Sequence, residues 1–143
     1  MVDVKIKIIE GGRLPEFKTE GAVCADCYAR LNVLRRIAPH KRAKIPLGFA
    51  LELPSDWEAV IRPRSSLTLG SVDNGIGTID VDYRGEVSTV VINNSDNYFT
   101  VENGDRVCQI AIREAPKVKF TVVDELSATE RGAGGFGSTG IKN

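Results

Sequence analysis

The chain has 143 residues, 42% of them hydrophobic, which is enough for one domain with a real core. Its 19 basic and 19 acidic residues balance, so charge gives no support for general binding to nucleic acid or to a membrane surface. The N-terminus lacks the apolar core of a signal peptide, and no apolar run approaches the roughly 20 residues that span a bilayer. We therefore expect a soluble, cytoplasmic protein.

The N-terminal half begins with a strand and a pair of cysteines. Apolar and polar residues alternate over residues 2–8, which predicts a half-buried strand. Cys24 and Cys27, with Cys108 and His40, could supply four zinc ligands. A second closely spaced pair is absent, and residues three apart on a strand point to opposite faces. We therefore expect small, buried, reduced thiols.

Asp26 stands alone in the apolar run between these cysteines. A buried carboxylate without a partner is unfavourable, so a hydrogen-bond donor or a cation should lie beside it. A purely structural role, with Asp26 bound to backbone amides, is an equally good interpretation at this point.

Two strands and a short helix are expected next. Apolar residues alternate over 45–53 and predict one strand, and a further strand covers 57–62. Ser65 or Ser66 would then cap a short helix. A helix start beside Arg64 is a natural anion site, although two serines before a leucine are usually only a cap.

The most informative stretch is residues 74–86, which begins with an asparagine and glycines typical of a turn. Ile79 and Val81 then alternate with Asp80 and Asp82, which favours a strand, and more specifically a hairpin, with both acids on one face. Such a strand beside a glycine turn can line a pocket in which backbone amides approach a ligand. The alternative is a solvated acidic face.

The remaining elements are short and strand-like. Strands are predicted at 87–92, 98–101, 107–112 and 117–123, separated by turns rich in asparagine, glycine and aspartate. Eight or more short strands with almost no helical periodicity predict an all-β sandwich or barrel.

The composition changes near residue 127, so we expect a β domain over 1–126 and a mobile tail over 127–143. Residues 131–140 contain five glycines, and they do not form a Walker A site because the Gly-Lys-Ser/Thr ending is missing. Two interpretations of this tail are possible: its amides surround an anionic ligand, or it is an ordinary disordered terminus. The presence of Arg131 and Phe136 favours the first.

Taken together, five blocks of this sequence resemble the trimeric deoxyuridine triphosphate nucleotidohydrolases, the dUTPases, over nearly the whole chain. The third and the fifth are highly specific. The blocks are Ala25-Asp-Cys-Tyr-Ala29, Pro63-Arg-Ser-Ser-Leu67, Gly77-Thr-Ile-Asp-Val-Asp-Tyr-Arg-Gly85, Gly104-Asp-Arg-Val-Cys-Gln-Ile110 and the glycine-rich tail. One departure is that Cys24-Ala-Asp-Cys27 stands where the family usually has Gly-Tyr-Asp-Leu.

The resemblance implies a jelly-roll-like β-barrel that forms a homotrimer, with active sites at subunit interfaces and each tail closing over a neighbouring subunit's site. The implied reaction is hydrolysis of dUTP to dUMP and pyrophosphate by attack of water at the α-phosphorus. It would supply dUMP for dTMP synthesis and keep uracil out of DNA. Mg²⁺, bound mainly through the triphosphate, is the implied cofactor.

The resemblance also assigns roles to individual residues. Asp80 would orient and deprotonate the attacking water, and Asp26 would hold waters of the magnesium ion. Tyr83 would pack under the deoxyribose and Phe136 would stack on the uracil. The implied substrate-binding residues are Arg64, Ser65, Ser66, Asn74, Gly77, Thr78, Ile79, Tyr83, Gln109, Arg131, Phe136, Gly137, Ser138 and Thr139.

Two alternatives are weighed beside this interpretation. A dCTP deaminase has the same fold, but no glutamate-bearing deaminase motif replaces residues 79–85. A regulatory protein of this fold that has lost hydrolysis is disfavoured by the intact Asp80, Arg64, Tyr83 and tail. A second, partner-binding role would leave no recognisable mark in the sequence.

Overall fold

The computed structural model describes residues 1–142, and this part of the chain is nearly all β. It forms eleven strands and one short helix. Their bounds are β1 Lys5–Ile8, β2 Ala25–Tyr28, β3 Arg35–Ile37, β4 Arg42–Pro46, β5 Phe49–Glu52, β6 Trp57–Arg62, α1 Ser65–Leu69, β7 Val72–Asn74, β8 Gly77–Ile79, β9 Ser88–Asn93, β10 Phe99–Val101 and β11 Arg106–Glu114.

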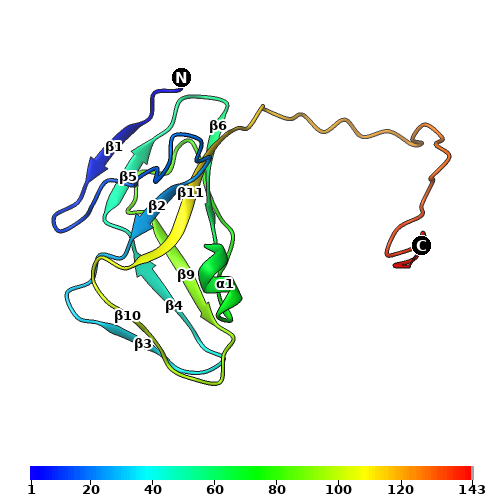
Figure 1. The fold of residues 1–143 in the computed structure, drawn as a ribbon. Coiled ribbons are helices and arrows are strands. Elements are labelled where there is room, and N and C mark those ends of the chain that lie inside the picture. Colours follow the sequence, from blue (N-terminus) through cyan, green and yellow to red (C-terminus); the bar gives the residue numbers. More distant parts are fainter. Residues whose placement is uncertain (143) are drawn as a thin grey trace.

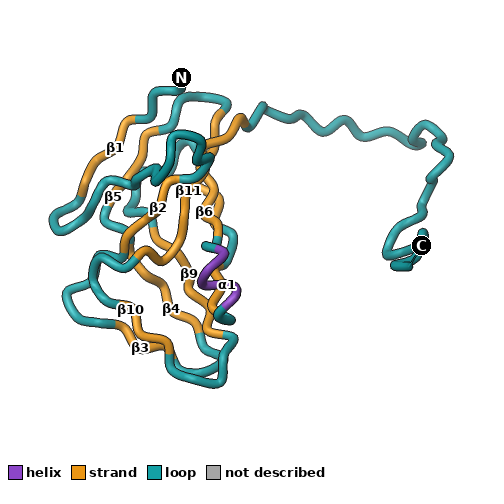
Figure 2. Tube along the Cα trace, viewed as in Figure 1, coloured by secondary structure: helices purple, strands orange, loops and turns teal. Residues whose placement is uncertain are grey.

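The strands pair into four small antiparallel sheets that wrap one core (Figure 1). Their orders are β2-β11-β6-β8, β4-β9-β7, β1-β5 and β10-β3. Over residues 1–142 no single sheet closes on itself, so the architecture is a jelly-roll-like β-clip and not a closed barrel. The helix α1 lies at the side of the strands, and the connections between elements are mostly short loops (Figure 2).

The core is built from the apolar residues that alternate along these strands, as the period of two predicts. Its largest fully buried apolar side chains include Phe49, Ile45, Leu47, Ile61, Val87 and Val91. Cys27 and Cys108 are also fully buried free thiols, facing each other in the β2–β11 register, whereas Cys24 is half-buried. The expectation of buried thiols is thus confirmed for two of the three cysteines.

The single strand expected over 45–53 is in fact two strands, β4 and β5, although its alternating residues are buried as expected. The break falls at Gly48, whose φ is +78°, a left-handed conformation that favours glycine. A Cβ on Gly48 would lie 2.4 Å from the Cα of Gly12. Two stretches of backbone therefore touch here, and the alternation of apolar residues continues through the break.

This contact makes Gly12→Ala an informative stability variant. A Cβ on Gly12 would lie 2.0 Å from the carbonyl oxygen of Gly48, so backbone must move to admit it. We expect a loss of about 1–3 kcal/mol of folding free energy, as overpacking typically produces. Gly21→Ala is the matched control, because a Cβ there meets nothing within 4 Å. Equal denaturant midpoints for the two variants would contradict this expectation.

The hairpin predicted over residues 74–86 is wrong. β7 pairs with β9 and β8 pairs with β6, so the two strands do not pair with each other. The chain turns directly after β8: the amide of Tyr83 donates to the carbonyl oxygen of Asp80 (3.1 Å). Asp80 and Asp82 therefore lie in a turn and do not share a strand face.

Residues 117–123 form no strand, which also contradicts the prediction. The segment leaves the body at the end of β11 and runs outward (Figure 1). We call residues 115–126 the arm. Its apolar side chains Val118, Phe120 and Val122 are 72%, 92% and 96% exposed. A strand needs a hydrogen-bonding partner, and beyond Ala115, whose amide donates to the carbonyl oxygen of Asp56 (2.7 Å), the arm makes no backbone hydrogen bond within residues 1–142.

The strands expected at 57–62, 98–101 and 107–112 are confirmed, while β3 was not expected from the pattern. β3 is only three residues long and pairs with β10. Within residues 1–142, no helix is long and apolar enough to cross a bilayer.

Candidate active site

A pocket of about 270 Å³, lined by both polar and apolar residues, opens between β8, β9 and the turn after β8. This volume lies near the lower end of the usual range for ligand sites, about 300–1,000 Å³, and suits a small ring. Five residues that were predicted to bind substrate or to act in catalysis line this pocket: Gly77, Thr78, Ile79, Asp80 and Tyr83. Its lining residues are Lys44, Ile61, Gly77, Thr78, Ile79, Asp80, Tyr83, Glu86, Val87, Ser88, Thr89 and Val90.

The strand β8 gives this pocket a backbone wall. It is the last strand of its sheet and pairs only with β6, so its second edge keeps unpaired amides and carbonyls. Gly77 is packed closely on Ile61, because a Cβ on it would lie 3.4 Å from that side chain. A flat ligand with both donors and acceptors on one edge can therefore hydrogen-bond along β8, as a further strand would.

Asp80 follows β8 directly and its side chain is exposed at the rim of the pocket. A carboxylate in this position can accept a proton from a water molecule that stands beside a ligand in the pocket. The turn that presents it is held by Arg84, whose guanidinium donates to the carbonyl oxygen of Val81 (2.7 Å).

Tyr83 forms another wall of the pocket, and its orientation is fixed locally. Its hydroxyl donates to the carbonyl oxygen of Glu86 (3.0 Å). The ring crosses Gly85 so closely that a Cβ there would lie 2.4 Å from the hydroxyl oxygen. A residue without a side chain is therefore needed at Gly85, so that the Tyr83 ring can pass across the backbone and reach Glu86.

Asn74 is buried at the end of β7, and it is not among the residues that line the pocket. Its amide nitrogen donates to the hydroxyl oxygen of Thr89 (2.7 Å), and Thr89 does line it. Among residues 1–142, the Oδ1 atom of Asn74 is the one buried side-chain polar atom without a hydrogen-bond partner. It is a buried acceptor whose hydrogen-bonding capacity is not used by residues 1–142.

Glu86 at the pocket wall makes a bidentate ion pair with Arg30 (2.7 and 2.8 Å) and accepts from the amide of Gly48 (3.0 Å). The Arg30 guanidinium, helped by the Gly48 amide and by Lys44, holds the pKa of Glu86 below its ordinary range, although burial opposes this. Neither Glu86 nor Arg30 was predicted from the sequence as part of a site.

This ion pair predicts an acid-sensitive contribution to stability. Because the pKa of Glu86 is lowered by folding, its contribution is present above the ordinary glutamate pKa of about 4.3 and is lost as the pH falls through the folded value. The difference in melting temperature between wild type and Glu86→Gln should therefore shrink from pH 7 towards pH 3. Glu52→Gln, which removes the more exposed Lys5–Glu52 pair, should show a smaller change. A difference that stays constant over this range would rule the ion pair out as its cause.

A second cluster of charges lies where β2, β11 and the end of β6 meet. The carboxylate of Asp26 accepts from Arg64 (3.2 Å) and from Arg106 (3.0 Å), which confirms the expectation of a hydrogen-bond donor or a cation beside it. Arg64 also donates to the carbonyl oxygen of Arg106 (3.1 Å). Gln109 is the register partner of Asp26, and its amide donates to the carbonyl oxygen of Pro63 (2.8 Å). Two guanidiniums and one carboxylate leave a local charge of about +1, which suits an anion.

The helix cap predicted at Ser65 or Ser66 is wrong. The helix α1 is present, but its N-cap is Arg64, and no side chain caps it. The amides of Leu67 and Thr68 both donate to the carbonyl oxygen of Arg64 (3.0 Å each). Both serine side chains are exposed, and the amides of these first helical residues have no intrahelical acceptor.

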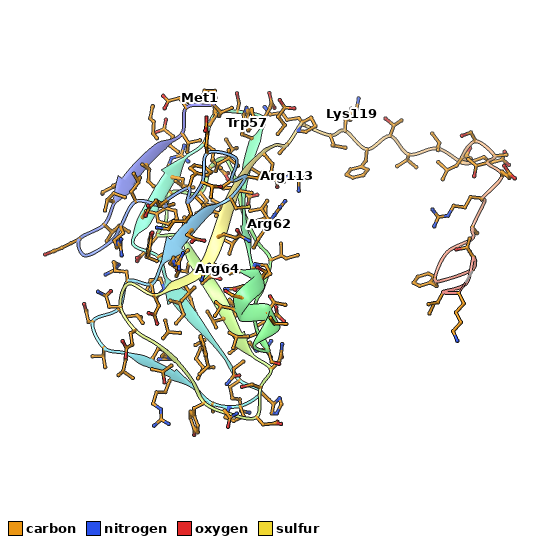
Figure 3. The ribbon with its side chains drawn as sticks, in the orientation of Figure 1. Met1, Trp57, Arg62, Arg64, Arg113 and Lys119 are labelled. Atoms are coloured by element: carbon orange, nitrogen blue, oxygen red, sulfur yellow. The ribbon has the colours of Figure 1, made fainter. Side chains whose placement is uncertain are left out.

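The tail folds only on itself. Arg131 and Gly134 exchange hydrogen bonds (2.8 and 3.0 Å), and the amide of Ser138 donates to Gly135 (3.1 Å). These turns surround an open hollow of about 840 Å³, lined by Thr129, Glu130, Arg131, Gly134, Gly135, Phe136, Gly137, Ser138 and Thr139. Over residues 127–142 every hydrogen bond of the tail joins it to itself, and Lys119 of the arm lies away from Arg64 in Figure 3.

The predicted site residues thus fall into three groups within one chain. The β8 pocket holds Asp80 and Tyr83, the charged cluster holds Arg64 and Asp26, and the tail holds Arg131. None of the pocket-lining residues belongs to the charged cluster or to the tail. Within residues 1–142 of one chain, these three groups therefore do not form a single site.

Lys44, Ser88 and Thr89 line the pocket although the sequence did not indicate them. Thr89 and Asn93 are buried polar residues of β9. Polar residues at buried positions of this strand are the only feature of the sequence that could have indicated Thr89. Lys44 gave no signal, since it alternates with buried residues on β4 as any solvent-facing residue does.

Known structures define the class of protein to which this fold belongs. The dUTPase of Staphylococcus bacteriophage 80alpha with dUpNHpp has a TM-score of 0.89 at 21% identity, covering 97% of this chain and 99% of the phage protein. A mutant dUTPase from phage phi11 of S. aureus, described as revealing the coordination of a structural Mg(II) ion, has a TM-score of 0.81 at 16% identity and covers 88% of this chain and 99% of that one. The fold is therefore that of the dUTPases.

Sequence comparison then identifies the family itself. The dUTPase family model matches residues 11–140, and the chain belongs to the dUTPase family. A deoxyuridine 5'-triphosphate nucleotidohydrolase from Treponema denticola is 46% identical, covering 98% of this chain and 99% of that protein. The protein of the same name from Desulfotalea psychrophila is 46% identical, covering 90% of this chain and 87% of that protein.

Proposed function

We propose that this protein hydrolyses dUTP to dUMP and pyrophosphate by attack of water at the α-phosphorus. Family membership and the names of its relatives support this activity. The single structural observation that carries it is the exposed carboxylate of Asp80 at the rim of a base-sized pocket. In the cytoplasm, the reaction would supply dUMP for dTMP synthesis and keep uracil out of DNA.

Uracil is the base that the pocket suits best. The free edge of β8 at Gly77, Thr78 and Ile79 offers both amides and carbonyls to a base edge. Asn74 adds a buried acceptor behind it. Cytosine would place donors against donors, a mismatch that buried sites reject strongly. The methyl group of thymine would meet the tight turn before β8.

The chemistry requires positioning and charge neutralisation more than covalent help from the protein. Asp80 orients the attacking water and takes its proton. Arg64 and Gln109 contact phosphate oxygens or their waters, assisted by the amides of Ser65 and Ser66. The tail then closes: Phe136 stacks on the base, while Arg131, Gly137, Ser138 and Thr139 bind the phosphates.

The separation of the three residue groups supports a homotrimer in which neighbouring subunits complete each site. The number three comes from the family resemblance. The arm supports the exchange of segments between subunits. Its apolar residues Val118, Phe120 and Val122 alternate with polar residues and are exposed, so they could be buried against a neighbouring subunit. An apolar hollow of about 160 Å³ on the body could receive such residues from a neighbour. It is lined by Val4, Ile6, Leu14, Pro15, Phe17, Ala25, Phe49, Leu51, Ile110 and Ile112.

The residues present fit a Mg²⁺ ion that is bound mainly by the triphosphate of the substrate. Within residues 1–142, no group of three or more His, Cys, Asp or Glu side chains is arranged to hold a metal ion. Asp26 is held between two arginines, so it would reach only water molecules of the ion through its remaining lone pairs. When bound, magnesium neutralises phosphate charge.

A pyrophosphate-release assay across dUTP, dTTP, dCTP and UTP with magnesium tests the function. We expect dUTP to be preferred by at least about a hundredfold in kcat/KM over each of the others. Ammonia release from dCTP would instead identify a deaminase. Nucleotide binding without turnover of any of the four would indicate a regulatory protein.

A further inference from the structure

The ion pair of Arg30 and Glu86 lies outside the residues assigned above, yet it is built into the pocket wall. Arg30 follows β2 by two residues, and Glu86 lies between the Asp80 turn and β9, 56 positions further along the chain. Both side chains are about one-quarter exposed, and their two parallel hydrogen bonds measure 2.7 and 2.8 Å. Such bidentate, charge-assisted pairs fix geometry more firmly than single contacts do.

Glycines make room for this pair. A Cβ on Gly48 would lie 3.1 Å from Cδ of Arg30 and 2.4 Å from Cα of Gly12. The amide of Gly48 donates to Glu86 (3.0 Å), and its carbonyl oxygen accepts from the amide of Ile9 (2.9 Å). The carboxylate of Glu86 is thus held on one side by a guanidinium and on the other by backbone that is itself fixed.

The backbone of Glu86 transmits this restraint to the pocket. Its carbonyl oxygen accepts the hydroxyl of Tyr83 (3.0 Å), and Glu86 itself lines the pocket. The next residue, Val87, is bonded to the backbone on both sides of Gly48, with distances of 2.8 Å to Phe49 and 3.0 Å to Leu47. A shift of Glu86 would therefore move the acceptor that orients the Tyr83 ring.

We propose that Arg30 and Glu86 act as a positioning pair that fixes the Tyr83 ring and thereby sets the selection of deoxyribose over ribose. This rests on the proposed function, since it requires the sugar to lie against Tyr83. The pair touches no reacting atom. It acts by fixing the carbonyl oxygen of Glu86, which in turn fixes the hydroxyl group of Tyr83. The Tyr83 ring then leaves no room for the 2′-hydroxyl of a ribose.

Calorimetric binding of dUDP and UDP tests the inference without turnover. In Glu86→Gln we expect the preference for dUDP over UDP to fall about tenfold, as loss of a charge-assisted restraint would produce. Arg30→Lys keeps the charge but loses the second parallel bond, and it should lose part of the preference. With dUTP as substrate, KM should rise in both variants while kcat stays within about twofold.

Glu52→Gln is the matched control, because it removes an exposed Lys–Glu pair that makes no hydrogen bond to Tyr83 or Glu86. Its preference should equal that of wild type. If Glu86→Gln and Arg30→Lys only lower the melting temperature and keep the wild-type preference, the pair is structural and the inference is overturned. If wild type prefers dUDP and the variants lose that preference, but dUTP is not hydrolysed, the proposed function fails and the positioning role stands.

Discussion

Asp80→Asn is expected to bind dUTP almost as wild type does and to lose most of its turnover. Asparagine keeps the size of the side chain and can still accept a hydrogen bond, but it cannot take a proton from water. Loss of a general base typically lowers kcat by about 10²–10⁴-fold. Because the side chain lies exposed in a turn after β8, the substitution should leave the fold unchanged.

Asp82→Asn is the control for this prediction. Asp82 is an exposed carboxylate in the same turn, and it does not line the β8 pocket. Its steady-state rate of pyrophosphate release should stay within about twofold of wild type, as for most surface substitutions away from a site. A near-normal kcat for Asp80→Asn, or equal losses in the two variants, would refute the assignment of Asp80 as the base.

Local patterns in this sequence predicted most of the buried apolar residues and most strands correctly. They failed where hydrogen bonding to a segment distant in the chain decides whether a strand forms. The alternation around Asp80 resembles a strand, but β8 ends at Ile79 because the next residues close a turn. The strand expected over residues 117–123 joins no sheet edge within residues 1–142 of its own chain. Both errors arise because a period of two records which side chains could face a core, while hydrogen bonding to a second segment decides whether a strand forms.

The candidate site was predictable only in part for the same reason. Asp26 was expected to need a hydrogen-bond donor or a cation, because it stands alone in an apolar run. Which cations bind it could not be read from the sequence, because Arg64 and Arg106 are 38 and 80 positions away. Glu86 gave no signal in the sequence, because its partner Arg30 lies 56 positions away in the chain.

Truncation after Thr129 is expected to leave a folded protein with little activity. The tail makes its hydrogen bonds only within itself over residues 127–142, so its removal should not change the melting temperature of the body. It removes Arg131 and the phosphate-binding groups of the tail. Two charge-assisted contacts of about 2 kcal/mol each correspond to a loss of roughly a thousandfold in kcat/KM. Truncation after Gly140 is the control, and it should keep wild-type activity because the glycine-rich segment is intact.

Mixing the two inactive variants distinguishes a tail that closes over its own chain from one that closes over a neighbour. Co-refolded subunits of Asp80→Asn and of the truncated chain would form mixed trimers. If each tail serves a neighbouring subunit, some sites combine an intact Asp80 from the truncated chain with an intact tail from the other chain, and activity returns. If each tail closes over its own Asp80, no site contains both groups and the mixture stays inactive. Recovery of pyrophosphate release therefore supports tail exchange, and its failure in trimers shown to be mixed by mass spectrometry would exclude it.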